Sequence, residues 1–144
     1  MKKVITIAGS NSQNSINRKL LTYASDLLEH VEDVILNRRD DATERLLENK
    51  KGPSRKAGEL DNRGSHFYLA LYWAEALVAQ TIDTDLSAEF VPLAKQLAEN
   101  ETKIVSELND IQGNPVDIGG YYEPKEDLIN KAMRPSATLN SVLS

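Results

Sequence analysis

The sequence contains no cysteine and no long hydrophobic run, and each absence excludes a class of protein. Without cysteine there is no disulfide-stapled secreted scaffold, no thiolate metal site and no cysteine nucleophile among the 144 residues. No run of about 18 apolar residues occurs, so no segment is expected to span a membrane. The remaining composition, 40% hydrophobic and 27% charged, predicts a packed core and a cytoplasmic protein. The length fits one ordinary domain or two small pieces.

The net charge of −5 is unevenly distributed along the chain. Residues 64–144 carry five basic and twelve acidic side chains, whereas residues 38–63 carry eight basic and six acidic ones. An acidic body disfavours binding to nucleic acid, because phosphate contacts dominate that affinity. The local basic excess is either a solvated face or a site for a small anionic ligand such as a phosphate. Its members are Lys50, Lys51, Arg55, Lys56 and Arg63.

The first 36 residues have the pattern of a β-α-β unit. Residues 3–8 and 32–36 are short β-branched runs that indicate strands, and residues 16–29 show helical spacing of apolar positions. A polar, glycine-led loop over residues 9–15 joins the first strand to this helix. Such a loop presents free backbone N–H groups at the positive end of a helix dipole, which suits a phosphate.

This opening resembles that of NADPH-dependent FMN reductases with the flavodoxin-like fold, over about residues 2–36. The resemblance implies that FMN is a cofactor and that its phosphate is held by Ser10, Ser12 and Asn17. The alternative is an ordinary helix start with serine and asparagine caps.

After residue 40 we find no convincing strand. We therefore expect an α/β but mostly helical protein, with a short β-α-β piece over residues 1–38 followed by a helical region over residues 39–144. The predicted helices run from a cap at Asp40 or Asp41 to about Asn49, from a cap at Ser65 to about Gln80, from about Asp85 to Gly113 with Pro92 as a kink or boundary, and from Glu126 to Met133 before Pro135. The second of these is apolar on most sides, which requires burial among neighbours or self-association.

A second, longer resemblance covers about residues 40–144. The segments that carry it are residues 41–44, 51–56, 58–74, 115–122 and 133–138, and they look like the C-terminal part of monomeric-type NADP-dependent isocitrate dehydrogenase. This chain departs from the family's pattern at Leu139, where the family has Phe. The resemblance implies oxidation of isocitrate with NADP and Mg²⁺ or Mn²⁺ to give 2-oxoglutarate, CO₂ and NADPH. It also implies that Arg63 contacts the 2′-phosphate of NADP.

The physical case for Arg63 is sound, because a guanidinium offers a fixed fork of donors to a phosphate. Gly64 would permit a close backbone approach, and the following helix start would add its dipole. The alternative is an ion pair between Arg63 and Asp61 or Glu59.

The resemblance also implies what this chain does not supply. The family's metal-binding aspartates, isocitrate-binding serine and arginine cluster, and catalytic lysine and tyrosine lie upstream of the matched segment. We therefore expect part of an isocitrate dehydrogenase joined near residues 37–40 to a flavodoxin-like start, inactive alone, with a dinucleotide or small molecule as ligand. The alternatives are an FMN-binding module and a non-enzymatic helical remnant that self-associates.

Overall fold

The structure is a computed structural model that describes residues 32–144, and these residues form six helices without a strand. The helices are α2 (Glu32–Glu48), α3 (Asn62–Ala79), α4 (Thr84–Glu99), α5 (Glu101–Asn109), α6 (Glu126–Met133) and α7 (Ala137–Val142). The helical prediction for the larger part of the chain is therefore confirmed. The predicted strand and helix over residues 3–29, and the candidate FMN residues Ser10, Ser12 and Asn17, lie outside the described residues.

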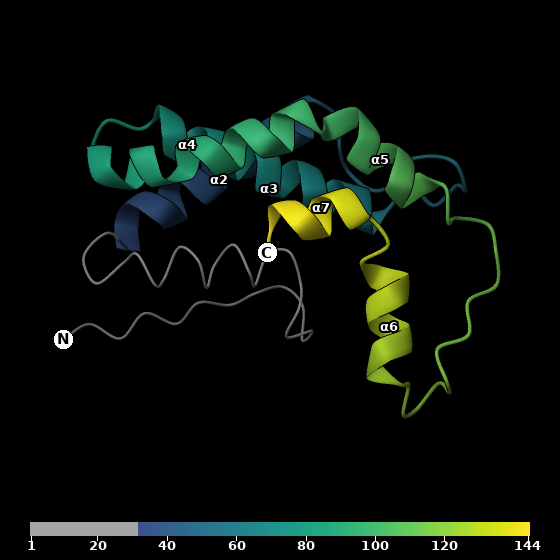
Figure 1. Cartoon of the computed structure of the whole chain (residues 1–144). Coiled ribbons are helices and arrows are strands. Elements are labelled where there is room, and N and C mark those ends of the chain that lie inside the picture. The colour runs from purple at the N-terminus through teal and green to yellow at the C-terminus, as the bar shows by residue number, and fades with distance from the viewer. Residues whose placement is uncertain (1–31) are drawn as a thin grey trace.

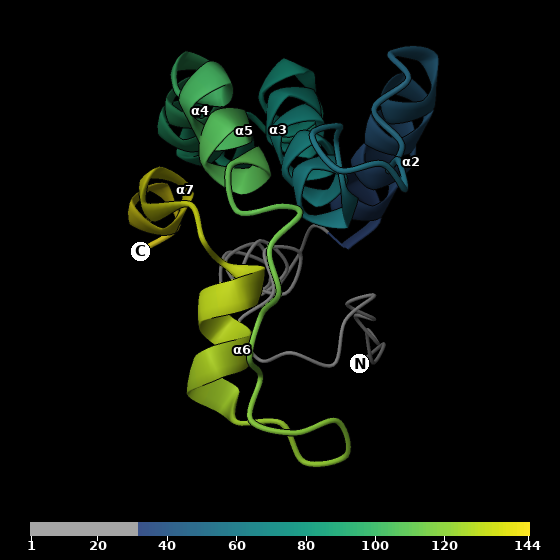
Figure 2. The same ribbon diagram turned by 90° about the vertical axis from the view of Figure 1, so that its right-hand side faces the viewer.

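Helix α3 lies between α2 and α4, as the three adjacent ribbons of Figure 2 show. Helix α5 continues beyond the end of α4, and α7 packs against both of them (Figure 1). Helix α6 projects away from this layer in both views, at the end of a long connection from α5. The described region is therefore a helical body with one arm, which comprises residues 114–134.

The core is built around α3, whose sequence is apolar on most sides. Phe67, Ala70, Ala74 and Leu77 are all fully buried on this helix. Complete burial of a large apolar side chain contributes about 1.5–3 kcal/mol, so α3 is the element on which its neighbours depend. The neighbours supply further buried side chains, namely Phe90, Leu97, Ile104, Leu108 and Leu139.

The strand predicted over Glu32–Leu36 is wrong, because these residues form the first turns of α2. A short apolar run does not distinguish a strand from a buried helix by its periodicity. Tertiary packing decides here: Ile35, Ala42 and Leu46 are buried on one side of the helix, and the Trp73 indole Nε1 donates to the Ile35 carbonyl at 3.0 Å. The caps predicted at Asp40 and Asp41 are also wrong, since both residues lie inside α2.

The predicted helix from Asp85 to Gly113 is two helices, with Asn100 between α4 and α5. Pro92 lies inside α4 rather than at a boundary. Proline has no backbone N–H, so the carbonyl four residues earlier, that of Ala88, loses its usual intrahelical hydrogen bond. Both Pro92 and Ala88 are exposed, so water can satisfy that carbonyl and the helix continues.

The final predicted helix is confirmed at Glu126–Met133. Pro135 follows it as expected, but the chain then forms α7, which the sequence analysis missed. Helix α7 is short. Its N-cap is Ser136, whose Oγ accepts the Leu139 N–H at 3.0 Å, and Glu107 of α5 accepts the Thr138 N–H in addition. Within residues 32–144, none of the helices has both the length and the apolar character needed to cross a membrane.

Candidate functional site

The first turn of α3 begins at Asp61, which is its N-cap, and not at Ser65 as predicted. Asp61 Oδ1 accepts the backbone N–H of Arg63 at 2.9 Å and that of Gly64 at 3.1 Å. Two of the four backbone donors left open at a helix start are thereby satisfied. The sequence does carry a signal for this cap, because Asp61 precedes Arg63 by two residues and Gly64 by three. The sequence analysis chose Ser65 instead. Ser65 is instead buried within α3.

The guanidinium of Arg63 is held between two helices. Its Nε donates to Asp61 Oδ2 at 2.9 Å, and its Nη2 donates to the same oxygen. Its Nη1 donates to the carbonyl of Ala132, in the last turn of α6, at 2.8 Å. The side chain is only 17% exposed. Of the predicted alternatives, the ion pair with Asp61 is present, while Glu59 pairs with Lys56 at 3.8 Å.

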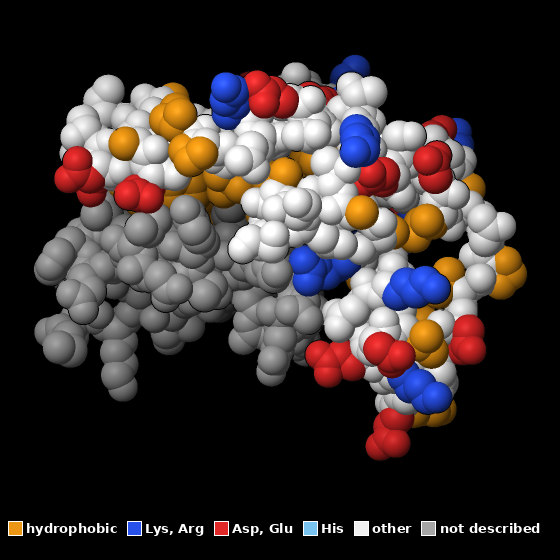
Figure 3. Space-filling model, in the orientation of Figure 1, with side chains coloured by type: hydrophobic (Ala, Val, Ile, Leu, Met, Phe, Trp, Pro, Cys, Tyr) orange, Lys and Arg blue, Asp and Glu red, His pale blue; other side chains and the backbone are white. Residues whose placement is uncertain are grey.

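The ion pair does not use every donor of the guanidinium. Arginine has five N–H groups, and the three bonds described leave one on Nη1 and one on Nη2. A second arginine, Arg134, follows two residues after Ala132, and its buried Nε has no hydrogen-bond partner within the described part of the protein. Figure 3 shows Lys and Arg side chains at the surface where α6 meets α7. The junction of α3 and α6 therefore holds cationic hydrogen-bond donors that could bind an anion.

The electrostatics of this pair favour the charged form of Asp61. Burial by itself would raise the pKa of Asp61, but the hydrogen bonds from Arg63 and Gly64 and the positive charge of Arg63 outweigh it. The pKa of Asp61 therefore lies below its ordinary value. Asp61 is therefore ionised at neutral pH.

Gly64 leaves space for a neighbouring side chain. A Cβ atom at this position would overlap with the Leu60 Cδ1 atom, so the missing side chain lets Leu60 pack against the start of α3. This is a packing reason for the glycine, additional to the ligand approach that its sequence position suggests.

Parts of the basic loop before α3 contact distant segments of the chain. Lys51 Nζ lies 4.0 Å from the centroid of the Tyr68 ring, in cation–π geometry. The side chain of Gln112 fastens the loop, because its Oε1 accepts the Gly58 N–H at 2.7 Å and its Nε2 donates to the Glu59 carbonyl at 2.9 Å. Of the predicted basic residues, Arg63 is thus the one that the structure places in a bridging position between helices.

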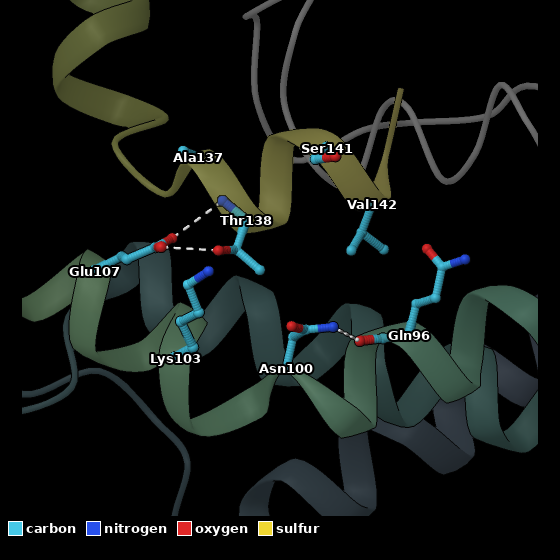
Figure 4. A pocket seen from close by; sticks show the side chains of 8 residues that line it. All are labelled: Gln96, Asn100, Lys103, Glu107, Ala137, Thr138, Ser141 and Val142. Carbon is cyan, nitrogen blue, oxygen red and sulfur yellow. Dashed lines mark hydrogen bonds between the residues drawn. The ribbon is translucent and has the colours of Figure 1, made fainter.

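An open groove of about 480 Å³ lies between α7 and the α4–α5 junction. Figure 4 shows Glu107 and Thr138 facing each other across it. The Glu107 carboxylate accepts from Ser136 Oγ at 2.6 Å, from Thr138 Oγ1 at 2.8 Å and from the Thr138 N–H at 3.1 Å. These bonds, chiefly those from the two hydroxyls, lower the pKa of Glu107. At this groove α7 is therefore docked against α5, and the Glu107 carboxylate of α5 already has hydrogen-bond donors from Ser136 and Thr138.

The described residues thus form a helical body in which an arginine is held between α3 and α6 with two N–H groups uncommitted. The profile of the family described as monomeric isocitrate dehydrogenase matches residues 15–144, and the chain belongs to this family. The match begins inside the segment that resembles FMN reductases, and the comparisons give no support to that resemblance or to FMN.

Individual relatives show the same relationship. "Isocitrate dehydrogenase [NADP]" of Azotobacter vinelandii is 60% identical over 111 residues, which is 77% of this chain and 15% of the relative. "Isocitrate dehydrogenase [NADP] 2" of Colwellia maris is 55% identical over the same shares, and that of Mycobacterium tuberculosis is 58% identical over 72% of this chain and 14% of the relative. The chain therefore spans about 15% of the length of these curated relatives.

Proposed function

We propose that this chain contributes part of the NADP site of an NADP-dependent isocitrate dehydrogenase, with Arg63 binding the 2′-phosphate. In such an enzyme isocitrate is oxidised to 2-oxoglutarate and CO₂, and NADP accepts the hydride. Family membership supports the choice of cofactor. The observation that carries the role of Arg63 is its clamped guanidinium, with one uncommitted N–H on each terminal nitrogen.

The donors fit a phosphate better than a neutral group. Two N–H groups of one planar guanidinium can bind two oxygens of a phosphate at once. The low exposure of the side chain strengthens the interaction, because water competes less effectively for the donors. The orphaned Nε of Arg134 is a further donor near the same turn of α6.

The described residues do not fit the divalent metal of the family reaction. Within residues 32–144 there is no group of three or more His, Asp or Glu side chains that could hold a metal ion. We derive no metal-dependent step from them, and we assign this chain to cofactor binding. We expect the purified chain to produce no NADPH from isocitrate and NADP with added Mg²⁺ or Mn²⁺, and measurable production would contradict this assignment.

Binding of nucleotide fragments tests the role of Arg63. The full chain is titrated with 2′,5′-ADP and with 5′-ADP, which lacks the 2′-phosphate, and affinities are measured by calorimetry or NMR. We expect tighter binding of 2′,5′-ADP, and we expect Arg63→Met to weaken it by about tenfold or more while leaving 5′-ADP unchanged. Arg63→Lys keeps the charge but not the fork of donors and should give an intermediate result. Equal affinity of the wild-type chain for both ligands would contradict the proposal.

A further inference from the structure

Asp61 uses its two carboxylate oxygens for two separate tasks. Oδ1 caps α3 by accepting from the backbone N–H groups of Arg63 and Gly64. Oδ2 accepts from Nε and Nη2 of the Arg63 guanidinium. An ionised carboxylate has about four lone-pair positions, so these four bonds occupy its capacity.

The second task fixes the position of the arginine. An unsupported arginine has several rotamers, and a ligand must immobilise it on binding. Here Asp61 holds the Nε edge and the Ala132 carbonyl holds Nη1, so the remaining N–H groups point in set directions before a ligand arrives. The side chain of Asp61 is itself only 24% exposed, which limits its own motion.

The saturation of Asp61 has a consequence for selectivity. A carboxylate with a free lone pair can accept a hydrogen bond from a ribose hydroxyl, which favours a ligand without the 2′-phosphate. Because Asp61 already accepts four hydrogen bonds, it offers little to such a hydroxyl. The donors of Arg63 remain as the groups that recognise the 2′ position.

We propose that Asp61 is a positioning residue that makes Arg63 selective for a 2′-phosphate over a 2′-hydroxyl. This inference rests on the proposed role of Arg63 in binding the cofactor. It assigns to Asp61 a contribution that is separate from its capping of α3.

The variant Asp61→Asn separates the two tasks. Asparagine is as good an N-cap as aspartate, and its Oδ1 can still accept the two backbone N–H groups. Its Nδ2 donates instead of accepting, so the bonds to the guanidinium are lost. We expect the ratio of affinities for 2′,5′-ADP and 5′-ADP to fall by about three- to tenfold, the range that corresponds to immobilising one flexible side chain on binding. The helical circular dichroism of the chain should be unchanged.

If Asp61 acted only through its negative charge, Asp61→Asn would raise the ratio of affinities for 2′,5′-ADP and 5′-ADP instead of lowering it. Removing a negative charge beside a phosphate site should strengthen phosphate binding, so a raised or unchanged ratio in Asp61→Asn overturns the inference. Glu59→Gln is the control for charge, since Glu59 makes no contact with Arg63. Asp83→Asn is the control for capping, because Asp83 caps α4 through the Leu86 N–H without an arginine partner. Both controls should keep the wild-type ratio, and a fall of similar size in either one also overturns the inference.

The two proposals fail in different ways. If the wild-type chain does not prefer 2′,5′-ADP, the proposed function fails, and this inference fails with it. If the wild-type chain shows the preference and Arg63→Met abolishes it, but Asp61→Asn retains it, only the role of Asp61 is overturned.

Discussion

At the scale of single residues, Arg63 shows that two alternatives drawn from a sequence need not exclude each other. The ion pair with Asp61 is present, yet it leaves two guanidinium N–H groups uncommitted. The sequence allowed the pairing partner to be predicted, because Asp61 is two residues away. It did not allow the Ala132 carbonyl to be predicted, since that contact joins residues 69 positions apart and depends on where α6 lies.

Glu107 provides a residue-scale prediction about pH. Its folded-state pKa is lowered by the hydrogen bonds from Ser136 and Thr138. A lowered folded pKa contributes stability above the unfolded-state pKa, and this contribution is lost as the pH falls through the folded value. We expect Glu107→Gln to reduce the free energy of unfolding by about 1 kcal/mol at pH 7, with the difference from wild type shrinking below about pH 4.

Urea unfolding of the wild type and Glu107→Gln between pH 7 and pH 3 measures this difference. Glu99→Gln is the matched control, because the Glu99 pair with Lys95 is well exposed at 3.8 Å and should contribute little. A difference for Glu107→Gln that stays constant across this pH range would contradict the account of the groove.

At the scale of elements, the sequence predicted the helices with strong apolar periodicity and missed those that depend on tertiary contacts. Helix α3 and helix α6 were predicted to within a few residues, because apolar patterning defines α3 and Pro135 marks the end of α6. The start of α2 was predicted as a strand, because three consecutive apolar residues at positions 34–36 show no helical spacing. The bond from Trp73 to the Ile35 carbonyl is a tertiary contact that the sequence does not reveal. Helix α7 was missed although Ser136 after Pro135 is a capping signal, because the helix has only six residues and depends in addition on Glu107 from another helix.

The central position of α3 predicts where substitutions are costly. Leu77 is fully buried on α3, whereas Leu47 on α2 is 66% exposed. We expect Leu77→Ala to reduce the free energy of unfolding by about 2–5 kcal/mol, through lost apolar burial and the cavity left behind. Leu47→Ala is the same chemical change at an exposed site and should cost less than about 0.5 kcal/mol. Similar losses for the two variants, measured by chemical unfolding, would show that α3 is not the centre of the core.

At the scale of the whole molecule, the described region has a well-packed body and an arm whose apolar side chains are open to solvent. None of the residues of α6 is buried. Val116, Tyr121, Tyr122 and Met133 on the arm are each more than half exposed, and Figure 3 shows hydrophobic side chains on its surface. Such a patch on a protein commonly marks an interaction surface.

Self-association was one of the alternatives that the sequence analysis left open for apolar helices, and the exposed side chains of the arm are where we expect it. We expect the sedimentation coefficient of the chain to rise with concentration and the double substitution Tyr121→Ser, Tyr122→Ser to reduce that rise. Leu47→Ser on α2 is the control for removing an exposed apolar group elsewhere. A chain that sediments as a monomer at all concentrations, or an unchanged rise in the double variant, would contradict this prediction.

The proposed function of the whole molecule depends most on recognition of the 2′-phosphate of NADP by Arg63. The most direct test records the Nε–H resonance of Arg63 in ¹⁵N-labelled chain, assigned by its loss in Arg63→Lys, during titration with NADP and with NAD. The account predicts that this resonance shifts with NADP and stays in place with NAD at the same concentration. No shift with NADP, or equal shifts with the two nucleotides, would contradict it.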